Sequence, residues 1–170
     1  TENYKLMEDL NFKNEGRDIL ITNTYTGVLD GGNHTITNLN IQDGNTGLIK
    51  SLSGSLKNIS ITNYQQIVYN GNYAGIISVI SNRKAEINNV HVKNAKLELG
   101  NSVEVSAGIL VGKSVGGKIQ NCSVTYGEII TTSEVKNIVV GGIIGNSSDT
   151  VIRNSFVSDI NLQITKATKT

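Results

Sequence analysis

One short pattern occurs five times in this sequence, and it limits the possible folds more than any other feature. It consists of an aliphatic residue, a polar residue, Asn, a small or apolar residue, any residue, and a second aliphatic residue. The five asparagines are Asn38, Asn58, Asn89, Asn121 and Asn154. A second pattern, a small residue followed by Gly and two aliphatic residues, precedes each copy by 11 to 14 residues. Its glycines are Gly27, Gly47, Gly75, Gly108 and Gly142.

The spacing between the repeats favours a β-solenoid. Successive glycines of the second pattern lie 20, 28, 33 and 34 residues apart, so the motifs stay constant while the connections lengthen. Short strands with connections of variable length are typical of stacked coils about 4.8 Å apart. Ile, Val and Thr make up 52 of the 170 residues and Pro is absent, which also favours strands. We therefore predict an all-β fold, a right-handed parallel β-helix (β-solenoid) of about five coils with an N-terminal cap.

The Asn pattern predicts which side chains point into the coil. Counting from Asn, the residues at −2, +1 and +3 are mostly apolar and are expected to face inward, whereas those at −1 are polar and are expected to face outward. These inward positions break strict alternation, so the chain must bend at Asn, which tolerates left-handed backbone geometry. We expect the five side-chain amides to form a hydrogen-bonded ladder, and the five glycines to form tight corners before buried strands.

The repeats also suggest a domain organisation. Residues 1–26 depart from the pattern and are predicted to be an N-terminal cap or partial coil, residues 27–165 the β-solenoid repeats, and residues 166–170 a tail or link to the rest of a longer protein. We expect Lys96–Leu99 and Glu128–Thr131 to supply a further strand per coil, because apolar and polar residues alternate in these connections.

Composition excludes several classes of protein. Fifteen basic and 14 acidic side chains give a net charge of +1, which does not fit a nucleic-acid or polybasic membrane binder. A single Cys cannot form an internal disulfide. The longest apolar stretch, Ile138–Ile144, is far shorter than the roughly 20 residues of a membrane span.

The residues that could carry chemistry do not form a recognisable site. His34 and His91 fall at different positions of the repeat, so a shared metal site is not expected, and His34 is interpreted as a turn residue. Cys122 occupies an inward position and is predicted to be a buried thiol. The acidic residues considered for catalysis fall in different columns: Asp30, Asp43, Glu86 and Asp149. We therefore expect no catalytic residue, cofactor or metal in this segment.

Tyrosines in the connections are the candidate partner contacts, because Tyr is enriched at protein interfaces. They are Tyr64, Tyr69, Tyr73 and Tyr126.

The sequence also resembles a known family. Gly142-Ile143-Ile144-Gly145 followed by Ile152-Arg153-Asn154 is similar to the GLUG motif of bacterial surface and secreted proteins. The run from Tyr4-Lys5-Leu6 to Ile160, which includes Asp30-Gly31-Gly32-Asn33-His34, resembles the N-terminal region of streptococcal zinc metalloproteases of the immunoglobulin A protease type. The resemblance implies a secreted or cell-wall attached protein of a Gram-positive bacterium, whose zinc and catalytic residues would lie outside this segment.

Two functions remain open at this point. The first is a non-catalytic scaffold and substrate-recognition domain of a secreted zinc metalloprotease, with immunoglobulin A or another host glycoprotein and other domains of the same chain as partners. The second is an adhesin stalk or carbohydrate-binding solenoid of a bacterial surface protein. Neither involves nucleic acid or membrane insertion.

Overall fold

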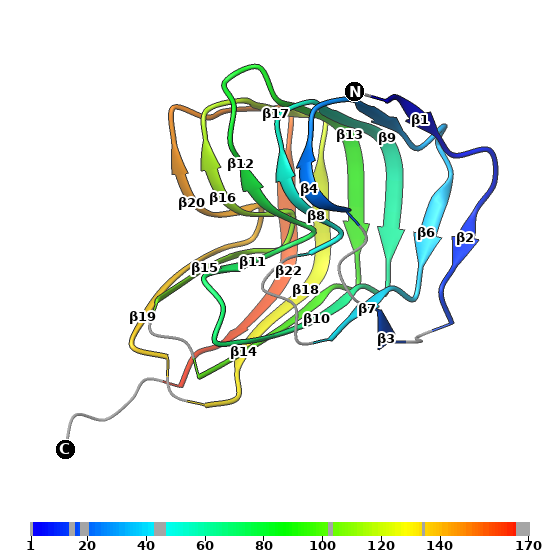
Figure 1. Ribbon diagram of the computed structural model, residues 1–170. Helices are drawn as coiled ribbons and strands as arrows, with labels where there is room; N and C mark the ends of the chain where they lie inside the picture. The colour runs from blue at the N-terminus through cyan, green and yellow to red at the C-terminus, as the bar shows by residue number, and fades with distance from the viewer. Residues whose placement is uncertain are drawn as a thin grey trace.

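Parallel strands stacked coil upon coil make up the computed structural model, which describes residues 2–13, 16–17, 21–42, 47–101, 104–133 and 135–165. All regular elements of these residues are β-strands, and they pair in three parallel sheets. In Figure 1 the stack runs from β2, in blue at one end, to β20, in orange at the other. The predicted all-β parallel β-helix is confirmed.

Four successive groups of strands form the complete turns of the solenoid. The first turn contains β5 (Val28–Asp30), β6 (Thr35–Thr37), β7 (Asn40–Ile41) and β8 (Ile49–Leu52). The second contains β9 (Ser55–Thr62), β10 (Gln65–Tyr69), β11 (Tyr73–Ala74) and β12 (Ile77–Ile80). The third contains β13 (Glu86–Lys93), β14 (Lys96–Gly100), β15 (Glu104–Gly108) and β16 (Val111–Val115). The fourth contains β17 (Lys118–Gln120), β18 (Ser123–Thr131), β19 (Asn137–Gly141) and β20 (Ile144–Ser148).

Partial turns flank these four. The leading strands are β1 (Tyr4–Lys5), β2 (Leu10–Asn11), β3 (Gly16–Arg17) and β4 (Ile21–Tyr25), and the trailing strands are β21 (Val151–Arg153) and β22 (Phe156–Gln163). Strands β1 to β4 pair in order with β5 to β8, so the segment predicted as a cap or partial coil follows the same path as the repeats. The predicted tail at residues 166–170 lies outside the described residues.

Equivalent residues of successive turns pair in register and form rows along the solenoid. Leu56, Ile87 and Ile119 form one inward row, and all three are fully buried. The row at +3 has the same character, with Ile61, Val92 and Val124. Each such aliphatic side chain contributes on the order of 1.5–3 kcal/mol to folding through its burial. The predicted inward positions are therefore confirmed in these three turns.

The longer connections form the predicted further strand. Lys96 to Leu99 in β14 pairs in register with Glu128 to Thr131 in β18. Leu97 and Ile129 point into the core and are fully buried, whereas Glu98 and Ile130 are half-buried on the outer side. The alternation of apolar and polar residues in these connections therefore predicts the further strand correctly.

Three of the five predicted corner glycines stack on one another. Gly47, Gly75 and Gly108 lie so close that a methyl group on Gly47 would overlap the carbonyl oxygen of Gly75, and one on Gly75 would overlap that of Gly108. Gly75 also has a φ of +152°. Close backbone approach therefore requires Gly at this corner.

Of the other two glycines, Gly142 does not occupy the corner position, and Gly27 occupies a corner in a different row. Gly141, not Gly142, pairs with Gly108, and Gly142 lies one residue after the corner. Gly27 lies against Gly54, at the corner before β5 and β9, and belongs to a different row from Gly47. The short Gly motif fits glycines at two adjacent corners equally well. Only the strand register shows which corner a given Gly occupies.

Candidate functional site

The candidate recognition surface is a narrow strip of outward-facing residues on β9, β13 and β18. It lies between two rows of residues at which the coils bend, which we call the first and second corner rows. Its outward residues come from two rows: Ser60, His91 and Ser123, and beside them Thr62, Lys93 and Thr125. The strip is polar because every second side chain of these strands points away from the core. We call it the polar strip.

The first corner row contains four of the five predicted ladder asparagines. Asn58, Asn89, Asn121 and Asn154 have φ values of 54°, 56°, 56° and 48°, which is the left-handed geometry expected at a bend. The Asn89 amide donates to Oδ1 of Asn58 at 3.0 Å, and that of Asn154 donates to Asn121 at 3.4 Å. Between them the ladder shifts by one residue, because the Asn121 amide donates to Asn88 at 3.0 Å.

Asn38 does not belong to this row, so that part of the ladder prediction is wrong. Asn58 donates instead to Asp30 at 3.1 Å, and Leu29 pairs with Leu56. Asn38 accepts a hydrogen bond from the Asn63 amide at 3.0 Å. The cause is a tight turn at residues 31–34, in which Gly32 and Asn33 have positive φ and the N–H of His34 donates to the carbonyl of Gly31. Because of this tight turn, β6 is shifted along β9 relative to β5.

The second corner row was not predicted. It contains Asn38, Asn63, Asn94, Tyr126 and Asp159, all with φ between 54° and 58°. The Asn94 amide donates to Asn63 at 3.3 Å, which continues the bond from Asn63 to Asn38. The sequence contains a signal for this second row. In the second and third turns, another Asn that follows an aliphatic residue and any one residue lies five residues after the Asn of the first motif.

His91 and Lys93 lie in the polar strip, and an aromatic ring lies at its border. His91 is exposed, and its Nδ1 lies 2.9 Å from the Ser123 hydroxyl while its Nε2 lies 3.0 Å from Oδ1 of Asn89. The Lys93 ammonium lies 5.7 Å from the centre of the Tyr126 ring, which is 57% exposed. The strip and the corner rows that border it therefore offer half-buried hydroxyls, amides, a cation and an exposed aromatic ring on one surface, whereas the Ser123 hydroxyl is buried.

The four candidate tyrosines do not form one patch. Only Tyr126 borders the polar strip. Tyr69 ends β10 and Tyr73 begins β11, on either side of another corner, and Lys113 lies 5.8 Å from the Tyr73 ring. Tyr64 is fully buried and its hydroxyl donates to Gln66 at 3.1 Å, so its prediction as a partner contact is wrong. Tyr64 follows a second-row Asn and therefore points inward, as Leu39 and Ala95 do in the same row.

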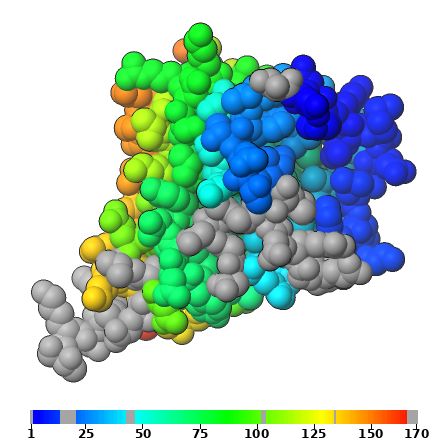
Figure 2. Space-filling model, viewed as in Figure 1, coloured from blue at the N-terminus to red at the C-terminus, as the bar shows by residue number. Residues whose placement is uncertain are grey.

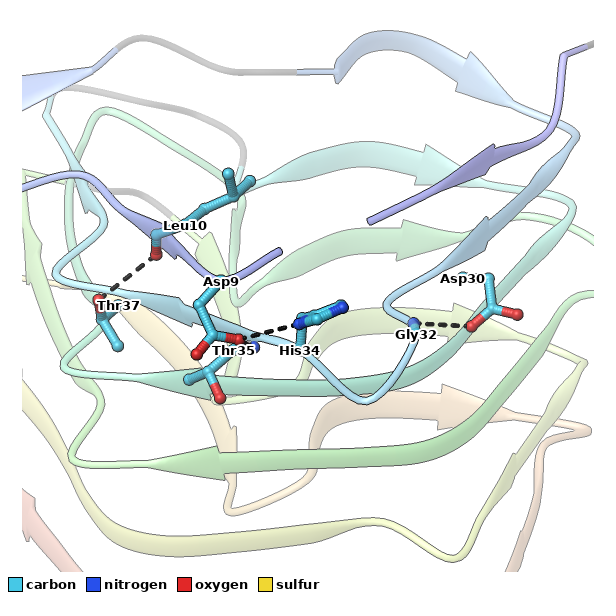
Figure 3. Close-up of polar contacts among 7 residues, drawn as sticks. All are labelled: Asp9, Leu10, Asp30, Gly32, His34, Thr35 and Thr37. Carbon is cyan, nitrogen blue, oxygen red and sulfur yellow. Dashed lines mark hydrogen bonds and ion pairs between the residues drawn. The ribbon is translucent and has the colours of Figure 1, made fainter. Parts of the chain in front are cut away.

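A second polar cluster lies at the start of the solenoid (Figure 3). Asp9 accepts a hydrogen bond from the backbone N–H of Thr35 at 2.8 Å and lies 3.2 Å from Nδ1 of His34. The bond from Thr35 is the main cause that lowers the pKa of Asp9, followed by the bond with His34. His34 thus holds a turn against the preceding coil, as the sequence predicted.

Asp30 fixes the same turn from its other side, where the N–H of Gly32 donates to it at 2.9 Å. This bond lowers the pKa of Asp30, with smaller contributions from Asn58 and Lys57. The Lys57 ammonium lies 3.4 Å from the carboxylate. Both aspartates are therefore engaged in holding the first turns together.

Other groups that could carry chemistry also have structural partners. Gln120 donates to Glu86 at 2.8 Å, and Arg83 pairs with Asp149 at 2.7 Å. Asp43 lies outside the described residues. Cys122 is buried as predicted, and burial raises the pKa of its thiol. Across the described ranges, His, Cys, Asp and Glu side chains form no group of three that could hold a metal ion.

No protein-family model matches this chain, and no curated protein or solved structure matches it either. Within the described part of the chain, no helix has the length and apolar character needed to cross a bilayer.

Proposed function

We propose that this chain is a non-catalytic scaffold and substrate-recognition domain of a secreted bacterial zinc metalloprotease that cleaves immunoglobulin A or another host glycoprotein. The resemblance of its sequence to that family supports the proposal. The observation that carries it is the polar strip, where outward side chains of successive coils repeat in straight rows. In this proposal the zinc and the catalytic residues belong to other domains of a secreted or cell-wall attached parent protein.

The polar strip has the chemistry of a surface that binds an extended partner. Successive residues of a row lie about 4.8 Å apart and present hydroxyls and amides at regular intervals, which can match the donors and acceptors of a peptide or glycan chain. Tyr126 supplies an exposed aromatic ring of the kind that dominates binding energy at many interfaces, and Lys93 adds a cation beside it. Because both residues lie on paired strands, binding has to order only side chains and not a loop.

Binding of the purified chain to immunoglobulin A tests the proposal directly. We expect saturable binding in a biosensor assay, and we expect Tyr126→Ala to weaken it by about tenfold or more. Tyr69→Ala is the matched control, because Tyr69 is also exposed but lies at another corner. No binding, or equal losses in the two variants, would contradict recognition by this strip.

The half-buried hydroxyls of the strip and the amides of the corner rows beside it also favour one alternative, an adhesin stalk or carbohydrate-binding solenoid. Amide and hydroxyl rows beside an exposed ring are suited to sugar hydroxyls and to the apolar face of a sugar. Enzymatically deglycosylated immunoglobulin A separates the two functions. Binding that survives deglycosylation supports protein recognition, whereas binding that disappears and is recovered with free glycan supports the alternative.

A further inference from the structure

A chain of side-chain hydrogen bonds crosses all four complete turns of the solenoid. Asn58 donates to Asp30 at 3.1 Å, and Asn89 donates to Asn58 at 3.0 Å. Nε2 of His91 lies 3.0 Å from Oδ1 of Asn89, and Nδ1 lies 2.9 Å from the Ser123 hydroxyl. Figure 2 shows the side chains of successive turns packed against one another, from blue at one end to orange at the other. This close stacking lets the bonds pass from turn to turn.

The direction of the bonds in this chain is set at its Asp30 end. Hydrogen bonds from the backbone N–H of Gly32 and from Asn58 lower the pKa of Asp30, so its carboxylate is ionised at neutral pH and acts as an acceptor. Asn58 therefore turns its NH₂ group to Asp30, and its oxygen accepts from the NH₂ group of Asn89. The oxygen of Asn89 is left to accept from Nε2–H of His91.

This direction determines where the proton of the His91 ring lies. A neutral imidazole carries one N–H, so the bond from Nε2 to Asn89 leaves Nδ1 as an acceptor. Nδ1 faces the Ser123 hydroxyl, which therefore donates its hydrogen to the ring. The Asn89 oxygen is engaged by His91 at the point where the first corner row shifts and Asn121 donates to Asn88.

The three groups at the end of the chain have the arrangement of an activated nucleophile. Such a site needs a hydroxyl within hydrogen-bond reach of a base, and a third group that orients the base. Ser123, His91 and Asn89 meet these conditions at 2.9 and 3.0 Å. Ser60 flanks His91 in the same row, but both ring nitrogens of His91 are engaged elsewhere. Activation is therefore expected at Ser123 and not at Ser60.

We propose that Ser123 is a reactive hydroxyl, activated by His91, that accepts an acyl or phosphonyl group from a donor with a good leaving group. Oγ of Ser123 attacks the electrophilic carbon or phosphorus, and the bond to the leaving group breaks as that group departs with its electron pair. The hydroxyl proton passes to Nδ1 of His91, which then releases a proton to water. Asn89 is a positioning residue, because it acts through the His91 ring.

Transfer to Ser123 should stop after one event. In this described part of the sheet, β18 pairs with β13 on one side of Ser123 and with β22 on the other. Its backbone N–H groups therefore belong to the ladder and are not free to stabilise an oxyanion, so water should remove the transferred group slowly. The proposal adds a stoichiometric modification site to a domain without turnover, and it holds whichever partner the polar strip binds.

Labelling of the purified chain with a small alkyl fluorophosphonate tests the proposal. A small reagent is needed because Ser123 is 7% exposed. One adduct should form with loss of fluoride, and peptide mass spectrometry should place it on Ser123. Ser123→Ala should remove the adduct, whereas Ser55→Ala is the matched control, because Ser55 is also on β9–β13 pairing but lies away from His91. No adduct, or equally fast labelling of Ser60, would overturn the proposal.

The role of the base is tested by His91→Gln, which keeps a polar side chain but removes the imidazole. We expect this variant to be labelled about tenfold more slowly or less, because general-base assistance is lost. Circular dichroism checks that the variant keeps its strands. Labelling at the rate of the unmodified chain would overturn activation by His91.

The positioning role of Asn89 has a spectroscopic readout that a purely structural role would not move. Nitrogen-15 NMR of the histidine ring, at a pH where the ring is neutral, should show the Nε2–H tautomer in the unmodified chain. Asn89→Gly removes the oxygen that holds this tautomer, so the Nε2–H signal should weaken and labelling of Ser123 should slow several-fold. An Nδ1–H tautomer in the unmodified chain would overturn the proposal without any substitution.

Discussion

Asn63 donates a hydrogen bond from its side-chain amide to Oδ1 of Asn38, at 3.0 Å and across one coil boundary. This bond defines the second corner row, which runs beside the first row of Asn58, Asn89, Asn121 and Asn154. At the Asn positions of both rows, one residue type combines two physical roles. Asn accepts the left-handed backbone needed for the bend, and its amide bonds to the coil before it.

Substitutions at Asn89 can separate these two roles. Asn89→Gly removes the amide but tolerates a φ of 56°, whereas Asn89→Ala loses the amide and also strains the backbone. We expect Gly to cost about 1–2 kcal/mol through the lost bonds to Asn58 and His91, and Ala about 1 kcal/mol more. Urea unfolding measures both. Equal stabilities of the two variants would show that the backbone geometry carries no cost.

Tyr126 is the member of the second row least suited to its backbone. Its φ is 55°, a conformation that bulky residues rarely adopt, and Asn occupies the preceding position of the row. We expect Tyr126→Asn to raise the free energy of unfolding by roughly 0.5–1 kcal/mol, by relieving strain and extending the amide row. Tyr126→Phe keeps the strain and should leave stability unchanged. Thermal unfolding of both variants checks this, and a less stable Asn variant would contradict it.

The fold was predictable because inward positions repeat in every turn. Leu56, Ile87 and Ile119 share one sequence context, and burial alone makes them stack. Asn38 was placed wrongly because Ile36-Thr37-Asn38-Leu39-Asn40-Ile41 satisfies the first motif equally well. Its true row depends on backbone pairing: residues 31–34 of the first turn lie against residues 58–59 of the second. The spacing of residues within the motif does not reveal that residues 31–34 shift the register.

The candidate site was predictable only in part, for the same reason. Tyr126 was identified from residue type, but the polar strip that it borders follows from the second corner row and so required the register. Residue type alone places Tyr64 among the candidate contacts in the connections, although Asn63 before it is a bend within the coil. Gln66 is fully buried between Ile41 and Leu97 of its row, where it accepts hydrogen bonds from the Tyr64 hydroxyl and from the N–H of Gly75. From its polarity alone, the Gln66 side chain would be predicted on the outer surface of the coil, which is wrong.

The corner glycines differ in what surrounds them, and this gives a stability prediction. A methyl group at Gly75 would overlap the Gly108 carbonyl and approach the Gly112 nitrogen at 2.9 Å, so backbone would have to move. We expect Gly75→Ala to cost at least about 2 kcal/mol. At Gly142 the contact is the Val157 side chain, 2.5 Å away and exposed, which can shift. Gly142→Ala should therefore cost less than about 1 kcal/mol in urea unfolding, and a similar loss at both sites would contradict this distinction.

Acid stability depends on the aspartates that hold the first turn. Hydrogen bonds to the ionised carboxylates lower the pKa of Asp9 and Asp30 in the folded chain, so the unfolded chain binds protons first as pH falls. Their contribution is fully present above about pH 4 and is lost as pH falls from there through the lowered pKa values. Asp30→Asn keeps an acceptor for Gly32 and Asn58 but does not titrate, so its free energy of unfolding should fall less steeply below about pH 4. Adding Asp9→Asn should flatten the profile further. Urea unfolding over a pH series measures these slopes, and a single variant as acid-sensitive as the unmodified chain would show that Asp30 is not linked to folding.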